Sequence, residues 1–445
     1  WQRMSYDWKK EYNEKTTTQK EAVKCVKSGD RIYAGTASSV AYGLLDALWE
    51  RKDKLEGVEI QSSQAFEPCA VYDEYEENPF SINTYFVGVD ERKMYRHGKP
   101  VRYTSFHLSQ APVWVTQNAK PNVCFFEVSA PDEEGYMSFG PSGVSCQEIL
   151  KETTRKIGGT IIAEVNPKVP YVLGKSNKIH VSEVDKIVEY ERPIMPYDTP
   201  ESDDIAKKIS DYIIAEVPDG ATIQLGLGNV STAIGYGLMT KNDLGIHTEL
   251  FNQPMIDLIE NGNVTNKCKG FMDGLNVYSF SLGTEKLYKF LDKNPAMYCA
   301  PFDFVNDPRI IAKNKRFVSI NSTMSIDIYG QCASECIAWN QQSGTGGQLD
   351  FVRGAQWSEG GKSFIAMTSS FIKNGKRVSK IVSSFAPGSV VTTPRSDVQY
   401  VATEYGCVNL KPLSIGDRAR ALIGLAHPDF RDELREEAKA HGLIK

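Results

Sequence analysis

Short apolar runs alternate with helix-like stretches and Gly-rich turns along most of the chain. The stretches "PNVCFFEVSAPDEEGY" and "GTIIAEVNPKVP" each contain an apolar strand that ends in a polar, turn-rich loop. This alternation is typical of an α/β protein with largely parallel sheets. A Pro-rich segment, "YERPIMPYDTPESDD" at residues 190–204, interrupts the pattern and resembles a linker. We therefore predict one domain over residues 5–192 and a second over residues 205–445.

The two predicted domains contain similar stretches. "SGDRIYAGTASSVAYGLLDAL", which begins at Ser28, aligns with "PDGATIQLGLGNVSTAIGYGL", which begins at Pro218. Each stretch is predicted to form a strand, a Gly-containing loop and a helix, followed by a second strand. The alignment sets Gln61 against Glu249, so only the second copy has a carboxylate at this position.

The second copy also predicts where Glu249 lies. "ATIQL" is a strand, "VSTAIGYGLM" begins a helix, and "LGIHTE" is the next strand, which ends at Glu249. A βαβ crossover makes the two strands parallel, so their carboxyl ends lie at the same edge of the sheet. We expect Glu249 beside the loop of residues 226–230, at the edge where open α/β sheets bind ligands.

That loop has a chemistry of its own. Gly226 and Gly228 permit close backbone approach, and the amides that open the next helix suit a phosphate or a developing oxyanion. "GLGNVS" matches the dinucleotide pattern Gly-x-Gly-x-x-Gly only in part, because Ser231 replaces the third glycine. A coenzyme cradle is the preferred interpretation. A structural turn and a nicotinamide site are the alternatives.

A second Gly-rich segment, "SGTGGQLDFVRGA" at residues 343–355, has three glycines in four positions. Such a segment suits a backbone that passes close to a ligand, although it also suits an ordinary loop between strands. Asp350 and Arg353 follow these glycines, and we expect them to pair and to hold the loop.

Composition excludes several classes of function. With 41% hydrophobic and 24% charged residues the chain is of the soluble globular type, and its net charge of -5 gives no general attraction to nucleic acid or anionic lipid. No apolar run is long enough to span a membrane, and the polar start has no signal-peptide core, so we expect a cytoplasmic protein.

Nine cysteines without a Cys-x-x-Cys pair and six scattered histidines predict reduced, mostly buried thiols and no metal centre.

Several longer motifs carry a resemblance. "GLGNVSTAIGYGL", "LGIHTELF", "INSTMSIDIYGQCASE", "GTGGQLDFVRGA" and "VTTPRSDVQYVATEYG" resemble the acetyl-CoA hydrolase/transferase family, in particular its 4-hydroxybutyrate and butyryl-CoA:acetate CoA-transferase branch. The motifs keep their order from about Trp8 to the C-terminus. The resemblance implies two similar, open, mostly parallel α/β domains that face each other across a cleft.

The resemblance also implies an activity. The protein would move coenzyme A between a short-chain acyl-CoA, of the butyryl or 4-hydroxybutyryl type, and a carboxylate such as acetate. The reaction would be ping-pong, through a glutamyl-CoA thioester. Coenzyme A would be substrate and covalent intermediate, with no tightly bound cofactor, and the protein would form a homo-oligomer, a dimer or a tetramer.

Carried over residue by residue, the family motif sets the nucleophile at Glu249. The predicted contacts with coenzyme A are Gly226, Leu227, Gly228, Asn229, Val230, Asn321, Gly346, Gly347 and Lys362.

Some features leave alternatives open. "LFNQPMIDL", which contains Glu249's next neighbours, lacks the small Asp-Gly or Asp-Ala pair of that branch, so a different acyl donor is compatible with the sequence. Gln61 is a weaker candidate for the cleft, and a packing role is favoured for it. A hydrolase, in which water cleaves the same thioester, is the main alternative function. A protein that binds a nucleotide-like ligand without turnover is the third.

Overall fold

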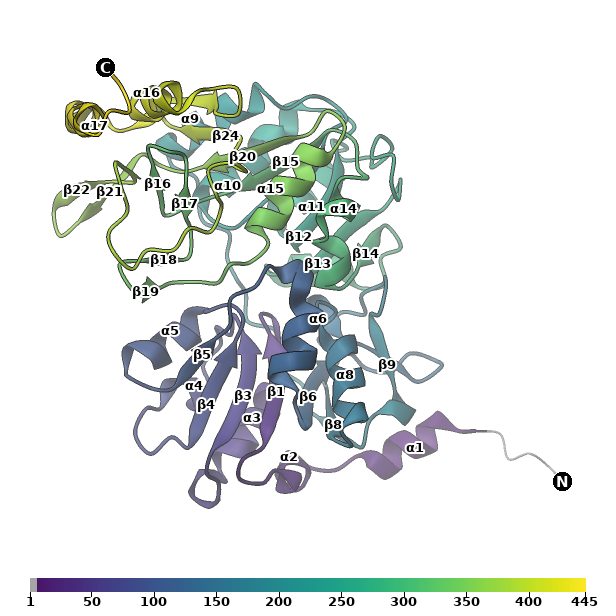
Figure 1. Ribbon diagram of the computed structural model, residues 1–445. Coiled ribbons are helices and arrows are strands. Elements are labelled where there is room, and N and C mark those ends of the chain that lie inside the picture. Colours follow the sequence, from purple (N-terminus) through teal and green to yellow (C-terminus); the bar gives the residue numbers. More distant parts are fainter. Residues whose placement is uncertain (1–5) are drawn as a thin grey trace. The chain divides into compact units, whose positions relative to one another are not determined.

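The computed structural model describes residues 6–445, so the predicted domain start at residue 5 lies outside the described residues. Contacts divide the chain into two compact units (Figure 1). Among the described residues, the first unit comprises 6–106, 110–197 and 278–303, and the second comprises 107–109, 198–277 and 304–445.

The change of unit after residue 197 falls inside the Pro-rich segment. Two continuous domains, 5–192 and 205–445, nevertheless describe the packing incompletely, because residues 278–303 pack with the first unit and residues 107–109 with the second.

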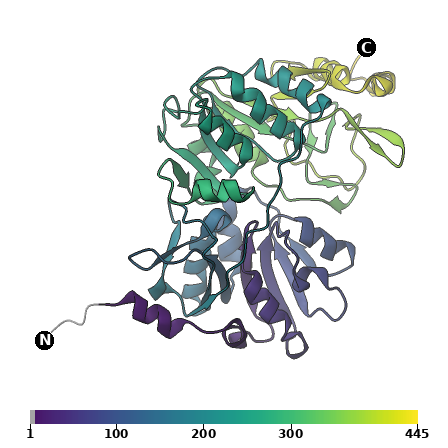
Figure 2. The same ribbon diagram turned by 180° about the vertical axis from the view of Figure 1, so that it is seen from behind.

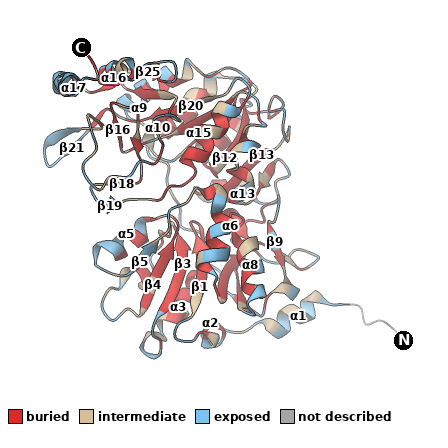
Figure 3. Cartoon of the chain, viewed as in Figure 1, coloured by how far each residue is buried: buried red, intermediate tan, exposed pale blue. Residues whose placement is uncertain are grey.

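The first unit is built on a sheet with the strand order β10-β8-β6-β1-β3-β4-β5, to which β2 adds antiparallel to β1. The pairings along this order are all parallel. Strands such as β3 and β6 are buried along their whole length, as expected for a parallel sheet covered on both faces (Figure 3). The strands are β1 (Arg31–Thr36), β2 (Ser39–Val40), β3 (Val58–Ser63), β4 (Phe80–Thr84), β5 (Val101–Tyr103), β6 (Val123–Val128), β8 (Thr160–Val165) and β10 (Lys186–Glu189).

Short helices and a small hairpin complete this unit. The hairpin pairs β7 (Tyr136–Ser138) with β9 (Lys178–His180). The helices are α1 (Trp8–Lys15), α2 (Gln19–Ala22), α3 (Tyr42–Trp49), α4 (Ala70–Asp73), α5 (Val89–Arg96), α6 (Ala111–Trp114), α7 (Gly140–Gly143) and α8 (Gln147–Lys156).

A later segment of the chain returns to the first unit. Residues 278–303 include most of β13 (Asn276–Ser281), α12 (Glu285–Leu291) and β14 (Met297–Cys299). The amide of Cys299 donates to the Leu173 carbonyl and the amide of Lys175 donates to the Cys299 carbonyl, each at 2.8 Å. These backbone bonds tie the returning segment to residues 173–175 of the first unit.

The second unit has the strand order β12-β11-β15-β20-β24-β25. Its pairings are parallel except for the antiparallel last pair. The strands are β11 (Thr222–Gln224), β12 (Gly245–Phe251), β15 (Phe317–Asn321), β20 (Lys362–Ala366), β24 (Tyr400–Thr403) and β25 (Gly406–Asn409). Smaller strands are β16 (Ser325–Asp327), β17 (Cys332–Ala333), β18 (Cys336–Ile337), β19 (Asn340–Gln341), β21 (Ser370–Lys373), β22 (Lys376–Ser379) and β23 (Ile381–Val382).

Helices cover both faces of the second sheet. Figure 1 shows α15 in front of it, and the view from behind shows α10 and α11 on the other face (Figure 2). The helices are α9 (Asp204–Ile214), α10 (Asn229–Gly237), α11 (Gln253–Glu260), α13 (Phe302–Val305), α14 (Pro308–Ile311), α15 (Gln348–Trp357), α16 (Ile415–Leu425) and α17 (Pro428–Ala440).

The two units share one topology. Starting from the second strand of each βαβ stretch, the order is β3-β1-β6-β8-β10 in the first unit and β12-β11-β15-β20-β24 in the second. All of these neighbours are parallel. The prediction of two similar, mostly parallel α/β domains is therefore confirmed.

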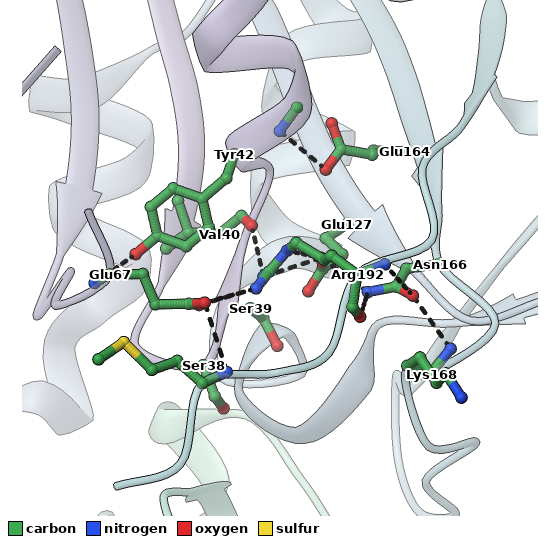
Figure 4. A network of polar contacts seen from close by, with 12 residues as sticks. Ser38, Ser39, Val40, Tyr42, Glu67, Glu127, Glu164, Asn166, Lys168 and Arg192 are labelled. Atoms are coloured by element: carbon green, nitrogen blue, oxygen red, sulfur yellow. Dashed lines mark hydrogen bonds and ion pairs between the residues drawn. The ribbon is translucent and has the colours of Figure 1, made fainter. Parts of the chain in front are cut away.

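A buried charge network holds the end of the first unit (Figure 4). Arg192, which follows β10, donates to both carboxylate oxygens of Glu67 at 2.8 Å and to Glu127 Oε2 at 2.9 Å. Its guanidinium also lies over the Tyr42 ring. Removal of one partner from such a buried group leaves an uncompensated charge, at a cost of about 3–5 kcal/mol.

Glu164 adds a carboxylate to the same region. It accepts hydrogen bonds from the backbone amides of Gly43 and Leu44, in the first turn of α3, at 3.3 and 2.7 Å. Burial raises the pKa of Glu164 to about 8, and the charge of Glu127 also raises it. Burial raises the pKa of Glu127 to about 7, against the opposing effect of Arg192.

These raised pKa values predict how stability depends on pH. A carboxyl group whose pKa is higher in the folded chain binds more protons when folded, so the free energy of unfolding falls as pH rises between the two pKa values. For Glu164 that range runs from about 4.3, the usual glutamate value, to about 8. One extra proton gives a slope of about 1.4 kcal/mol per pH unit.

We therefore expect the apparent melting temperature of wild type to fall more than that of Glu164→Gln as pH rises from 5.5 to 8.5, because the amide of the variant has no proton to lose. Thermal melts across that range test this, with the exposed Glu191→Gln as a matched control. Parallel pH profiles for wild type and Glu164→Gln would contradict it.

Candidate active site

Glu249 lies near the carboxyl end of β12 and is half-buried. Its strand is parallel to β11, with Thr222 opposite Gly245 and Ile223 opposite Ile246, as the βαβ pattern predicts. Asn306, in the turn after α13, donates from Nδ2 to Glu249 Oε2 at 2.6 Å. The carboxylate is thus fixed by an amide that lies far from it in the sequence.

The surroundings of Glu249 change its acidity. Burial raises the pKa of Glu249 to about 7, and the bond from Asn306 opposes this shift. A carboxylate with such a pKa is ionised in a large fraction of molecules at neutral pH, and it is more basic than an exposed glutamate. Strongly shifted carboxyl groups of this kind are common where a side chain takes part in chemistry.

The second Gly-rich loop lies against the same carboxylate. A Cβ added to Gly347 would overlap Glu249 Oε2 and Asn306 Nδ2. Gly347 is the N-cap of α15, so the positive end of that helix adjoins Glu249. Gly346 has a φ of 62°, which favours glycine. The structure therefore brings Gly347, which follows Gly346 in the chain, to Glu249.

Asp350, in the first turn of α15, is held differently from the expectation. Ser109 donates to its carboxylate from the backbone amide at 3.0 Å and from Oγ at 2.7 Å. Arg353 instead donates to Asp397, from Nε at 2.9 Å. The predicted hydrogen-bonded pair of Asp350 and Arg353 is therefore wrong. Burial raises the pKa of Asp350 to about 7, and the charge of Glu249 adds to the shift.

Residues 227–230 of the first Gly-rich loop line a cavity of about 910 Å³, whereas Gly226 is not part of the lining. Gly228, the N-cap of α10, has a φ of 113°, and a Cβ added there would meet no atom within 4 Å. Leu227, Asn229 and Val230 line the cavity with it. The lining does not include Glu249, Gly346 or Gly347.

Hydrogen bonds join the wall of this cavity to Gln348, the residue that follows Gly347. Gln348, next to Gly347, donates to the Ser322 carbonyl at 2.7 Å and accepts from Ser334 Oγ at 2.9 Å. Ser322 and Ser334 both line the cavity. Gln348 therefore lies between the wall of the cavity and Gly347, the glycine that adjoins Glu249.

Two basic residues of the cavity were missed from the sequence. Lys373 and Lys380 line it and belong to the hairpin of β21 and β22 and its C-terminal end. Asn374 and Gly375, both with positive φ, form the turn of this hairpin. Asn-Gly between two strand-like runs is a hairpin signal that could have directed attention to these lysines.

The other two predicted coenzyme contacts have different positions. Asn321 ends β15 at the carboxyl edge and precedes Ser322 of the cavity wall. Lys362 begins β20 and donates to the carbonyl and side chain of Glu216, at 3.0 and 3.3 Å. Since β15 and β20 are parallel and Asn321 pairs with Ile365, Lys362 lies about 10 Å away toward the opposite edge. The structure does not bring Lys362 to the site.

The remaining chemistry is sparse in the part of the chain that the structure describes. No group of three or more His, Cys, Asp or Glu side chains among residues 6–445 could hold a metal ion. Over the same residues, no helix has the length and apolar character that a membrane crossing needs. The nine cysteines are all unbridged thiols, six of them buried.

Gln61 is completely buried and donates to Glu59 and to the Ala119 carbonyl, so it has a packing role.

Comparisons with known proteins find coenzyme A transferases among the relatives of this chain. The 4-hydroxybutyrate coenzyme A transferase of Clostridium kluyveri is 38% identical, with 97% of this chain and 99% of that protein aligned. The butyryl-CoA:acetate CoA-transferase of Anaerostipes caccae is 36% identical, with 97% of each chain aligned. The crystal structure of RipA from Yersinia pestis is 37% identical and covers 99% of this chain and 100% of its own, with a TM-score of 0.91.

Residues 1–197 match the N-terminal domain of the acetyl-CoA hydrolase/transferase family, and residues 283–438 match its C-terminal domain. The chain therefore belongs to the acetyl-CoA hydrolase/transferase family. Similarity of this extent to curated CoA-transferases identifies it as an acyl-CoA:carboxylate CoA-transferase within that family.

The contact at Gly347 predicts a strong effect of one methyl group. Gly347→Ala should displace Glu249 and Asn306 and lower kcat/KM for CoA transfer by about 100-fold, the order expected for a misplaced reacting group. Steady-state kinetics measure this. Gly424→Ala is the matched control, since its added Cβ would meet no atom within 4 Å. Similar losses in both variants would contradict the role of Gly347.

Proposed function

We propose that the protein transfers coenzyme A between a short-chain acyl-CoA and a carboxylate such as acetate, by way of a thioester between coenzyme A and Glu249. The observation that carries this proposal is the half-buried Glu249 carboxylate held by Asn306 against Gly347. Acyl groups of the butyryl or 4-hydroxybutyryl type are proposed as donors, since the named relatives act on such groups.

The chemistry needs only a carboxylate and donors for an oxyanion. A Glu249 oxygen would attack the thioester carbonyl carbon, and the carbon–sulfur bond would break with the electron pair leaving on the CoA sulfur. The thiolate would then attack the Glu249 carbonyl carbon of the mixed anhydride. The bond between the Glu249 carbonyl carbon and the bridging oxygen would break, so the acyl group leaves with that oxygen as a free carboxylate. An incoming carboxylate reverses these steps, and no proton is gained or lost overall.

Asn306 and Gly347 are suited to stabilise the charge that develops in these steps. The Asn306 amide already donates to a Glu249 oxygen, and this oxygen becomes an oxyanion when the thiolate attacks. The backbone at Gly347 offers the N-terminal end of α15 on the same side. One preorganised donor of this kind contributes about 2.7–4 kcal/mol in the transition state.

The cavity of about 910 Å³ is proposed as the coenzyme site. Its volume lies within the range of about 300–1,000 Å³ usual for ligand pockets. The amides of the loop Leu227–Val230 and the ammonium groups of Lys373 and Lys380 suit the phosphates of coenzyme A. Asn321 is proposed at the edge of the same site, and Lys362 is left out of it because of its position.

Mass spectrometry tests the covalent step. After wild-type protein is mixed with acyl-CoA alone, we expect a CoA adduct that peptide mapping assigns to Glu249. Glu249→Gln should fold and form no adduct, whereas the exposed Glu359→Gln should behave as wild type. An adduct on a cysteine, or wild-type turnover by Glu249→Gln, would refute the proposed mechanism. Free thiol released without an acceptor carboxylate would instead support the hydrolase.

The cationic wall of the cavity gives a second test. Lys380→Ala should lower kcat/KM for acyl-CoA by about 10- to 100-fold, because a hydrogen bond to a charged group contributes about 1.5–3 kcal/mol. The same substitution should leave kcat/KM for acyl-pantetheine, which lacks the nucleotide, almost unchanged. Lys376→Ala is the control from the same hairpin, outside the cavity lining. An equal loss with both thioesters would contradict the phosphate role.

The homo-oligomer that the family resemblance predicts is tested separately by light scattering.

A further inference from the structure

Two side chains of β12 hold two consecutive residues of another segment. His247 and Glu249 are two positions apart on this strand, so their side chains leave the same face of the sheet. His247 Nε2 lies 2.7 Å from the Val305 carbonyl oxygen, and Asn306 Nδ2 lies 2.6 Å from Glu249 Oε2. The segment Val305–Asn306 is thus bound to the strand at two adjacent points.

The chemistry of the first bond is unambiguous. A carbonyl oxygen only accepts, so the proton of the His247 ring is on Nε2. Burial lowers the pKa of His247 to about 3, and the nearby Lys269, which donates to the Ile246 carbonyl, lowers it further. The completely buried ring also packs edge-on against Phe317. His247 is neutral and out of contact with solvent, so it donates a fixed bond rather than exchanging protons.

Asn306 depends on few other contacts. It is completely buried, and within the described chain its Oδ1 has no hydrogen-bond partner. The residue lies between two four-residue helices, α13 and α14, which are too short to fix a side chain by their own stability. The position of the Asn306 amide therefore follows the position of Val305.

We infer that His247 is a positioning residue for CoA transfer: its bond to the Val305 carbonyl sets the Asn306 amide at the carboxylate of Glu249. This inference depends on the proposed reaction at Glu249. His247 touches no reacting atom, and its effect passes through the backbone of Val305 to the side chain of Asn306.

Two substitutions of similar shape separate the hydrogen bond from packing. Gln at position 247 can donate to the Val305 carbonyl, whereas Met has a similar length and no donor. We expect His247→Met to lower kcat and the rate of CoA-adduct formation by about 10- to 100-fold, with KM for acyl-CoA changed less than about threefold. His247→Gln should recover most of the rate. Thr248→Val is the matched control, because Thr248 is equally buried on the same strand and bonds only the Leu250 carbonyl.

A double-mutant cycle excludes a general loss of stability. In an Asn306→Ala background, His247→Met should have almost no further effect on adduct formation, since the amide that His247 positions is absent. Two results would overturn the inference. In one, the effects of His247→Met and Asn306→Ala on the rate of adduct formation multiply. In the other, His247→Gln and His247→Met lose equal activity while their melting temperatures are unchanged. Absence of any Glu249 adduct in wild-type protein would instead overturn the proposed function. If His247→Met does not fold, His247→Leu, which also lacks a donor, replaces it in both backgrounds with the same outcomes expected.

Discussion

The bond between the Asn306 amide and the Glu249 carboxylate is the contact on which the site depends. Burial disfavours a charged carboxylate, and a charge-assisted hydrogen bond offsets part of that cost. The balance leaves Glu249 with a pKa of about 7, close to neutrality. A less buried carboxylate would be a weaker base, and one buried without the amide would carry a proton. The backbone at Gly347 can approach only because that position has no side chain.

Local patterns predicted the parts of the site that are local. The βαβ stretch set Glu249 at a strand end because parallel strands end at one edge, and the glycines marked the two loops. Asn306 could not be found in this way, because its role comes from a contact between segments 57 residues apart. Lys362 was placed wrongly in space, because a lysine beside a strand does not reveal which end of the strand it occupies. Asp350 and Arg353 have a spacing that suits a pair on one helix, yet their hydrogen-bonded partners are Ser109 and Asp397.

The two units use one topology for different purposes. The sequence alignment sets Gln61 of β3 at the position of Glu249 in β12. Gln61 donates to Glu59, whose carboxylate also pairs with Arg31 and Arg102. Positions that align in the sequence therefore carry a residue of a structural polar network in one unit and a poised carboxylate in the other. The shared fold accounts for neither outcome, which depends on the particular side chains.

The return of residues 278–303 to the first unit also constrains how the protein is made. A ribosome releases the chain from its N-terminus, and domains generally fold as they emerge. Here the first unit lacks its last segment until residue 303 has been synthesised, by which time β11 and β12 already exist. The first unit therefore cannot be complete before part of the second has been synthesised. For the same reason, a protease that cuts within residues 190–204 would yield a first fragment without the segment that completes its packing.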